Sequence, residues 1–109
     1  NHEPAITHMR DFGVAGFTAG CVCVAPSRST AMLKAILKKD YDKAEAIREE
    51  FVALEDLRNA HSPSLVLHHA VELAGVAGTG PVLPLLTELP ENLLPKIEKA
   101  AKALLANNG

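Results

Sequence analysis

Residues 14–25 read Val-Ala-Gly-Phe-Thr-Ala-Gly-Cys-Val-Cys-Val-Ala, an uncharged stretch of mostly small or β-branched side chains. The pattern, punctuated by Gly16 and Gly20, predicts a buried strand and its exit loop. Because neither face carries a charge, we expect a strand of a parallel sheet that helices cover on both sides. An unpaired buried strand would lose about 1–3 kcal/mol for each unsatisfied backbone group. The partner strands are therefore expected outside these 109 residues.

Helical patterns lie on both sides of this stretch. Pro4 and Gly13 are placed to open and close a short helix. After the stretch, apolar residues recur at spacings of three and four, which predicts amphipathic helices and a glycine- and proline-rich loop over residues 75–90. The expected starts of these helices are Ser27 or Ser29, Asp40, Ser62-Pro63 and about Asn92.

Composition limits the possible functions of the chain. Its 109 residues are 48% hydrophobic and 22% charged, which is typical of one globular domain. A net charge of -2 offers no basic surplus for nucleic acid, and no apolar run approaches the roughly 18 residues of a membrane span. Cys21 and Cys23 are too close in sequence to form a disulfide framework. We therefore expect a reducing, cytoplasmic setting.

A succession of landmarks runs along the chain, in the order Gly16-Phe17-Thr18-Ala19-Gly20, Val24-Ala25-Pro26, residues 37–44, Ser62-Pro63, Leu73-Ala74-Gly75 and Leu83-Pro84-Leu85. This succession resembles the last third of the dihydrodipicolinate synthase and N-acetylneuraminate lyase family. Three differences, Ala19, Cys23 and Val82, stand where family members often carry Ser, Asn and Arg, and they argue against the synthase reaction itself. The opening Asn1-His2-Glu3 and the Phe-Thr-Ala-Gly segment look closer to the sugar-acid dehydratase branch.

The resemblance implies an α/β fold, namely the C-terminal fragment of a (β/α)8 barrel. Residues 1–39 would form the end of the barrel, with a short helix, the eighth strand and the eighth helix, and residues 40–109 a helical extension. The implied activity is that of a Schiff-base lyase or aldolase acting on pyruvate, a related 2-keto acid or a sugar acid. No cofactor is implied. The implied partners are the rest of the barrel and further copies in a dimer or tetramer.

No catalytic residue of that chemistry is expected within the chain. An imine-forming lysine needs an apolar or cationic pocket that lowers its pKa, whereas all seven lysines fall on charged helical faces. The only tyrosine, Tyr41, lies on the apolar face of the long helix and is expected to pack in the core. The chain alone is therefore predicted to be inactive. By resemblance it would supply a wall of the substrate pocket, made of Glu3, Phe17, Thr18, Ala19 and Gly20.

Several of these residues have a second interpretation. Glu3 could instead cap the first helix, Thr18 could bond neighbouring backbone, and Gly16 and Gly20 would permit close backbone approach. A zinc site would have to use Cys21 and Cys23 with His61, His68 or His69, a spacing unlike that of zinc sites, so no metal is predicted. The alternative function is a small, all-helical protein-interaction module without catalytic activity. An unpaired strand argues against that alternative.

Overall fold

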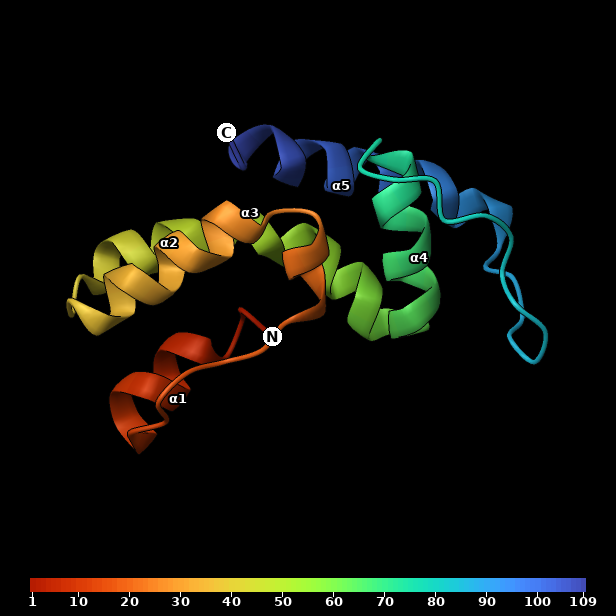
Figure 1. Cartoon of the computed structure of the whole chain (residues 1–109). Coiled ribbons are helices and arrows are strands. Elements are labelled where there is room, and N and C mark those ends of the chain that lie inside the picture. The colour runs from red at the N-terminus through yellow and green to blue at the C-terminus, as the bar shows by residue number, and fades with distance from the viewer.

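The computed structural model describes residues 1–109 and shows an all-helical chain (Figure 1). Five α-helices pack around one core, and two short 3-10 helices lie in the connections. No helix has the length and apolar character needed to cross a membrane. The helices are α1 (Ala5–Phe12), η1 (Gly20–Cys23), α2 (Pro26–Leu37), α3 (Tyr41–Ala60), α4 (Pro63–Leu73), η2 (Glu91–Leu93) and α5 (Leu94–Asn107).

The expected α/β fold is wrong, because the chain contains no strand. No backbone N–H of residues 15–19 donates a hydrogen bond, and no second extended segment lies beside them to form a ladder. The remainder of the expected strand turns into η1, where Cys21 is buried and Cys23 exposed. The chain is therefore not a piece of a β/α barrel. The small apolar residues that predicted a strand instead form an irregular connection between α1 and α2 (Figure 1).

The helices follow the local signals in the sequence closely. Gly13 closes α1 in the left-handed conformation, with φ of 69°, as its position predicted. Asp40 caps α3, and its carboxylate accepts a hydrogen bond from the Lys43 N–H at 3.3 Å. The predicted serine cap of α2 is wrong, because that helix begins at Pro26 after an Ala25 cap. Residues 75–90 form the predicted loop, with one turn near Leu83.

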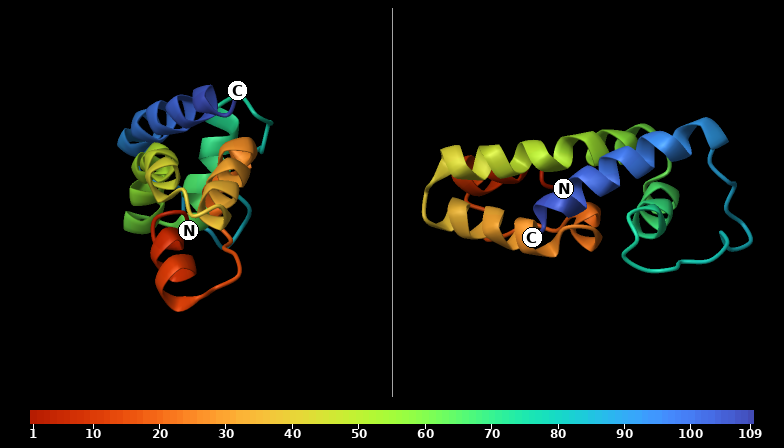
Figure 2. Two further views of the ribbon diagram at one scale, coloured as in Figure 1. Left: turned by 90° about the vertical axis from the view of Figure 1, so that its left-hand side faces the viewer. Right: turned by 90° about the horizontal axis from the view of Figure 1, so that it is seen from above.

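The core is built around α3, which packs against α2, α4 and α5, and η1 contacts α2, α3 and α4. Phe51 and Leu54 of α3 are fully buried, as is Met32 of α2. In the view from above, α5 runs across α3 (Figure 2). In Figure 1, α1 lies beneath α2 and α3. Tyr41 is partly buried against the core, as predicted, and the Arg10 guanidinium lies over its ring, 5.6 Å from the centroid. Leu37, the last residue of α2, is 64% exposed although it is apolar.

Candidate functional site

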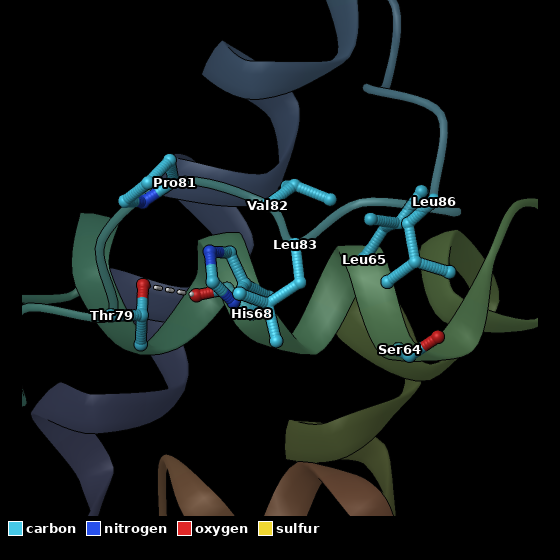
Figure 3. A pocket seen from close by; sticks show the side chains of 8 residues that line it. All are labelled: Ser64, Leu65, His68, Thr79, Pro81, Val82, Leu83 and Leu86. Atoms are coloured by element: carbon cyan, nitrogen blue, oxygen red, sulfur yellow. Dashed lines mark hydrogen bonds between the residues drawn. The ribbon is translucent and has the colours of Figure 1, made fainter.

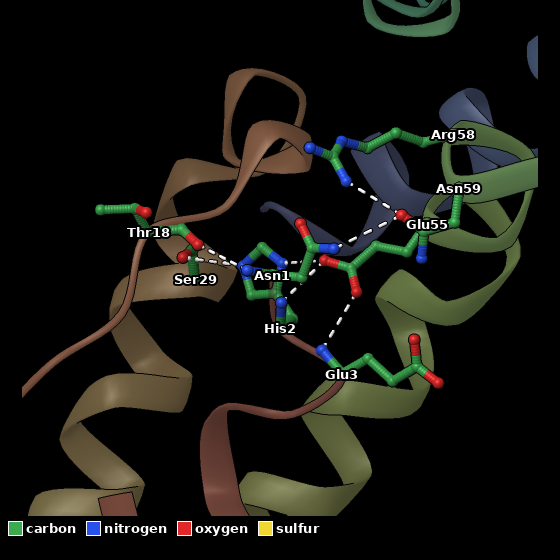
Figure 4. A network of polar contacts seen from close by, with 8 residues as sticks. All are labelled: Asn1, His2, Glu3, Thr18, Ser29, Glu55, Arg58 and Asn59. Atoms are coloured by element: carbon green, nitrogen blue, oxygen red, sulfur yellow. Dashed lines mark hydrogen bonds and ion pairs between the residues drawn. The ribbon is translucent and has the colours of Figure 1, made fainter. Parts of the chain in front are cut away.

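The most extensive buried polar cluster centres on His2, just before α1 (Figure 4). The His2 Nδ1 atom lies 2.8 Å from Glu55 Oε1 of α3, and Nε2 lies 2.9 Å from Ser29 Oγ of α2. The imidazole stacks on Phe51, with ring centroids 3.5 Å apart, and meets Phe17 edge-on at 5.4 Å. One side chain therefore joins the N-terminal segment, α2, α3 and the connection that contains Phe17.

Glu55 is the acceptor that holds this cluster together. Its carboxylate accepts hydrogen bonds from the backbone N–H groups of His2 at 2.7 Å and Glu3 at 3.0 Å, in addition to the bond from His2 Nδ1. Burial raises the pKa of Glu55, but the hydrogen bonds from His2 and Glu3 lower it by more than burial raises it. The pKa of Glu55 therefore lies below its usual range, and the carboxyl group stays ionised. A charged Glu55 fixes Nδ1 of His2 as a donor, and the second hydrogen bond of the ring joins Nε2 to the Ser29 hydroxyl.

These three side chains have the connectivity of a serine–histidine–acid triad. A nucleophilic serine must also reach a substrate carbonyl beside oxyanion-stabilising donors. Ser29 is only 9% exposed, and it lines none of the three cavities in the molecule. The cluster therefore anchors the N-terminal segment and offers no route for a substrate to Ser29.

The predicted pocket residues lie in the two segments beside this anchor, but none of them lines any of the three cavities of the molecule. The Asn1 backbone nitrogen donates a hydrogen bond to the Thr18 carbonyl oxygen at 2.6 Å, which joins the two segments directly. Glu3 does not cap α1, whose N-cap residue is Pro4, and its exposed carboxylate makes no hydrogen bond or ion pair. In Figure 4 that carboxylate points away from the cluster. The Thr18 hydroxyl is likewise without a partner, whereas Phe17 is partly buried against the core.

Ala19 and Gly20 have different surroundings from those expected of a pocket wall. Ala19 precedes η1 in an extended conformation, with φ of -151° and ψ of 137°. Gly20 faces α4 so closely that a Cβ atom would lie 2.5 Å from Leu67 Cδ1 and 3.1 Å from Arg58 Nε. The predicted close approach is thus present at Gly20. It is absent at Gly16, where a Cβ would meet nothing within 4 Å.

The cysteines and histidines considered for a metal do not converge. No three histidine, cysteine, aspartate or glutamate side chains lie close enough to hold an ion. Burial, followed by the charge of Glu55, raises the pKa of the Cys21 thiol to about 12. That thiol is therefore protonated at neutral pH and a poor nucleophile.

A separate cavity of about 320 Å³ lies between α4 and the loop that follows it (Figure 3). His68 closes one side, where its Nε2 donates to the Gly80 carbonyl oxygen at 2.8 Å, and the Thr79 hydroxyl lies 3.1 Å from the His68 carbonyl oxygen. Apolar side chains form much of the remaining wall, so the cavity suits an apolar group. The wall residues are Ser64, Leu65, Pro81, Val82, Leu83 and Leu86.

Sequence reasoning missed Glu55 as the central acceptor, although a signal for it existed. Glu55 follows Phe51 by four residues and so lies on the apolar stripe of α3, where a carboxylate requires a buried partner. Nothing in the sequence pointed to His2 as that partner, because the two residues are 53 positions apart.

Comparison with protein-family models, with curated proteins and with solved structures finds no match for this chain.

Proposed function

We propose that the chain is the helical portion of a lyase that forms a Schiff base with pyruvate or a related 2-keto acid. The proposal rests on the family landmarks in the sequence. The observation that carries it further is the attachment of Asn1 to Thr18 beside the buried His2–Glu55 anchor. Two segments that the resemblance assigns to a substrate pocket are held next to each other by this attachment. The exposed, unpartnered Glu3 carboxylate and Thr18 hydroxyl leave polar groups free for a substrate.

In this proposal the chain positions substrate, and a lysine beyond residues 1–109 forms the imine. All seven lysines of the chain are exposed on helices or turns, so none has the apolar setting that lowers an amine pKa. The imine withdraws electrons from the neighbouring carbon, which allows a C–C or C–O bond there to form or break. Glu3 and Thr18 would bind the polar part of the substrate that is not converted.

Borohydride trapping tests the chemistry. The complete protein that contains this sequence is incubated with pyruvate and sodium borohydride, digested and analysed by mass spectrometry. We expect a reduced pyruvate adduct on one lysine outside residues 1–109. No adduct with pyruvate, 2-oxobutyrate or 2-oxoglutarate would refute the lyase function, and an adduct on Lys34, Lys96 or another lysine of this chain would refute the wall role.

The proposed role of Glu3 and Thr18 in the wall of the substrate pocket has its own test in the same complete protein. Glu3→Gln and Thr18→Val should each lower kcat/KM about tenfold, the equivalent of about 1.4 kcal/mol of lost binding to the reacting substrate. Glu91→Gln, at an exposed glutamate before α5, is the matched control and should leave kcat/KM unchanged. Equal effects from all three variants would argue against a pocket at Glu3 and Thr18.

A second candidate function, an all-helical protein-interaction module, is favoured by a different observation. Leu83 is 73% exposed and Leu86 is 50% exposed, and both line the apolar cavity (Figure 3). Leu85, between them on the same loop, is fully exposed. Neighbouring exposed leucines of this kind mark interaction surfaces. Under this reading the complete protein shows no adduct in the trapping experiment, and Leu83→Ser with Leu85→Ser weakens recovery of a bound partner.

A further inference from the structure

A groove of about 330 Å³ lies between α3 and α5, and it shares no lining residue with the His2 cluster or with the cavity beside α4. Its floor consists of small or apolar side chains, and two lysines stand on its α5 side. Alanines leave little side chain above the backbone, so another helix can approach closely. The groove is lined by Ala53, Leu57, Lys96, Lys99, Ala100 and Ala103.

The charges on the two sides of the groove are opposite. Lys96 and Lys99 make no ion pair or hydrogen bond, whereas the nearby Lys102 is paired with Glu98. On α3, Asp56 lies one turn from Ala53 and is exposed without a partner. Around the axis of α3, at 100° per residue, Leu57 lies 40° to one side of Ala53 and Asp56 lies 60° to the other side. The α3 side thus presents an unpaired acid and the α5 side two unpaired bases.

This distribution of charge is self-complementary. A two-fold axis that runs along the groove, in the plane of the interface, places α3 of one copy over α5 of the other, and α5 over α3. Each Asp56 would then face the Lys96–Lys99 pair of the second copy, and the alanine floors would meet at the axis. We propose that this face is the dimer interface of the chain, with a second copy as its occupant. The inference does not depend on the lyase proposal.

The available surface is large enough for such a contact. A specific interface buries at least about 600 Å² on each partner, or about a tenth of the chain's 6281 Å². The groove itself spans about one turn of α3 and two turns of α5, so the contact extends beyond it along the exposed faces of these helices, which are about 30 and 21 Å long. Because the interface has exposed charges at its edges, association should weaken as salt rises.

A charge-swap experiment tests the arrangement by sedimentation velocity. The wild-type chain should sediment as a dimer at high concentration and dissociate on dilution. Lys99→Glu should sediment as a monomer because its new carboxylate would face Asp56 of the second copy. Asp56→Lys should do so because its new ammonium group would face Lys99. An equimolar mixture of the two variants should dimerise again, since the contact between Lys99→Glu and Asp56→Lys joins opposite charges.

Lys38→Glu is the matched control, because Lys38 is an exposed lysine at the end of α2 that does not line the groove. It should dimerise like the wild type, and circular dichroism should show equal helix content in all variants. A wild-type chain that stays monomeric at every concentration would overturn the proposal. So would variants that dimerise separately, or a mixture that remains monomeric.

Discussion

Gly20 is the residue whose lack of a side chain matters most to the packing of the molecule. A Cβ there would lie 2.5 Å from the end of the Leu67 side chain, closer than real contacts allow. We expect Gly20→Ala to lower the free energy of unfolding by about 1–2 kcal/mol, since Leu67 must shift and the contact between η1 and α4 loosens. Urea denaturation measures this change.

Gly16 provides the control for that substitution. An added methyl group there meets nothing within 4 Å, and φ is not positive. Gly16→Ala should therefore be neutral, or stabilise by about 0.4–1 kcal/mol through the unfolded chain. If both alanine variants lose the same stability, the close approach at Gly20 is not the cause.

Glu55 links the stability of the molecule to pH. Because folding lowers its pKa, the stabilising contribution of Glu55 is complete above the unfolded-state value of about 4.3 and is lost as pH falls through the folded-state value. Glu55→Gln should cost about 1–3 kcal/mol at pH 7. The difference between wild type and variant should then shrink as pH falls from about 5 to 3.

Chemical denaturation at several pH values measures that difference. The pKa values of Asp11 and Glu45 are also lowered, through their hydrogen bonds to Arg10 and Arg48. Both residues are present in the wild type and in the variant, so their contributions cancel in the comparison. A difference that stays constant between about pH 5 and 3 would show that Glu55 does not carry the acid sensitivity.

The turn between α2 and α3 has a strained residue at a defined position. The Lys39 N–H donates to the Ile36 carbonyl at 2.9 Å, and the Asp40 N–H donates to the Ala35 carbonyl at 2.9 Å, which is the Schellman pattern. Lys39 therefore adopts φ of 60°, a conformation that favours glycine. We expect Lys39→Gly to raise the free energy of unfolding by about 1 kcal/mol.

Lys38→Gly is the neighbouring control for this turn. Lys38 has an ordinary helical φ of -84°, so glycine there removes no strain and adds unfolded-state entropy. Its thermal transition should fall while that of Lys39→Gly rises. A lower transition for both variants would contradict strain at Lys39.

The elements show why sequence predicted the helices and failed on the strand. The ends of α1 and α3 depend on Gly13 and Asp40, whose effects extend over one turn and can be read locally. A strand depends on a partner, and the composition of residues 14–25 does not say whether one exists. Phe17 turns toward His2 and not toward a sheet. The same dependence on distant partners hid the His2–Glu55 pair, which no local pattern could reveal.

At the scale of the whole molecule, the chain is longer and flatter than usual for its size. It measures 42 × 28 × 19 Å, and its radius of gyration of 14.4 Å exceeds the roughly 13 Å of an average domain of this length. One continuous core of 19 residues nevertheless includes residues of all five helices. Unfolding should therefore be cooperative for the core, with the exposed connections opening separately.

Hydrogen exchange on the full chain resolves this difference between core and connections. Residues 15–19 donate no backbone hydrogen bond and lie partly exposed, so their amides should exchange at nearly the rate of an unfolded peptide. Amides around Phe51 and Leu54 in the middle of α3 should exchange only through global unfolding, many orders of magnitude more slowly. Dimerisation through the groove between α3 and α5 should leave residues 15–19 unprotected, because they are not part of that face. Protection at residues 15–19 would show that their backbone groups have found partners, in which case the irregular connection would have become the strand that its composition predicts.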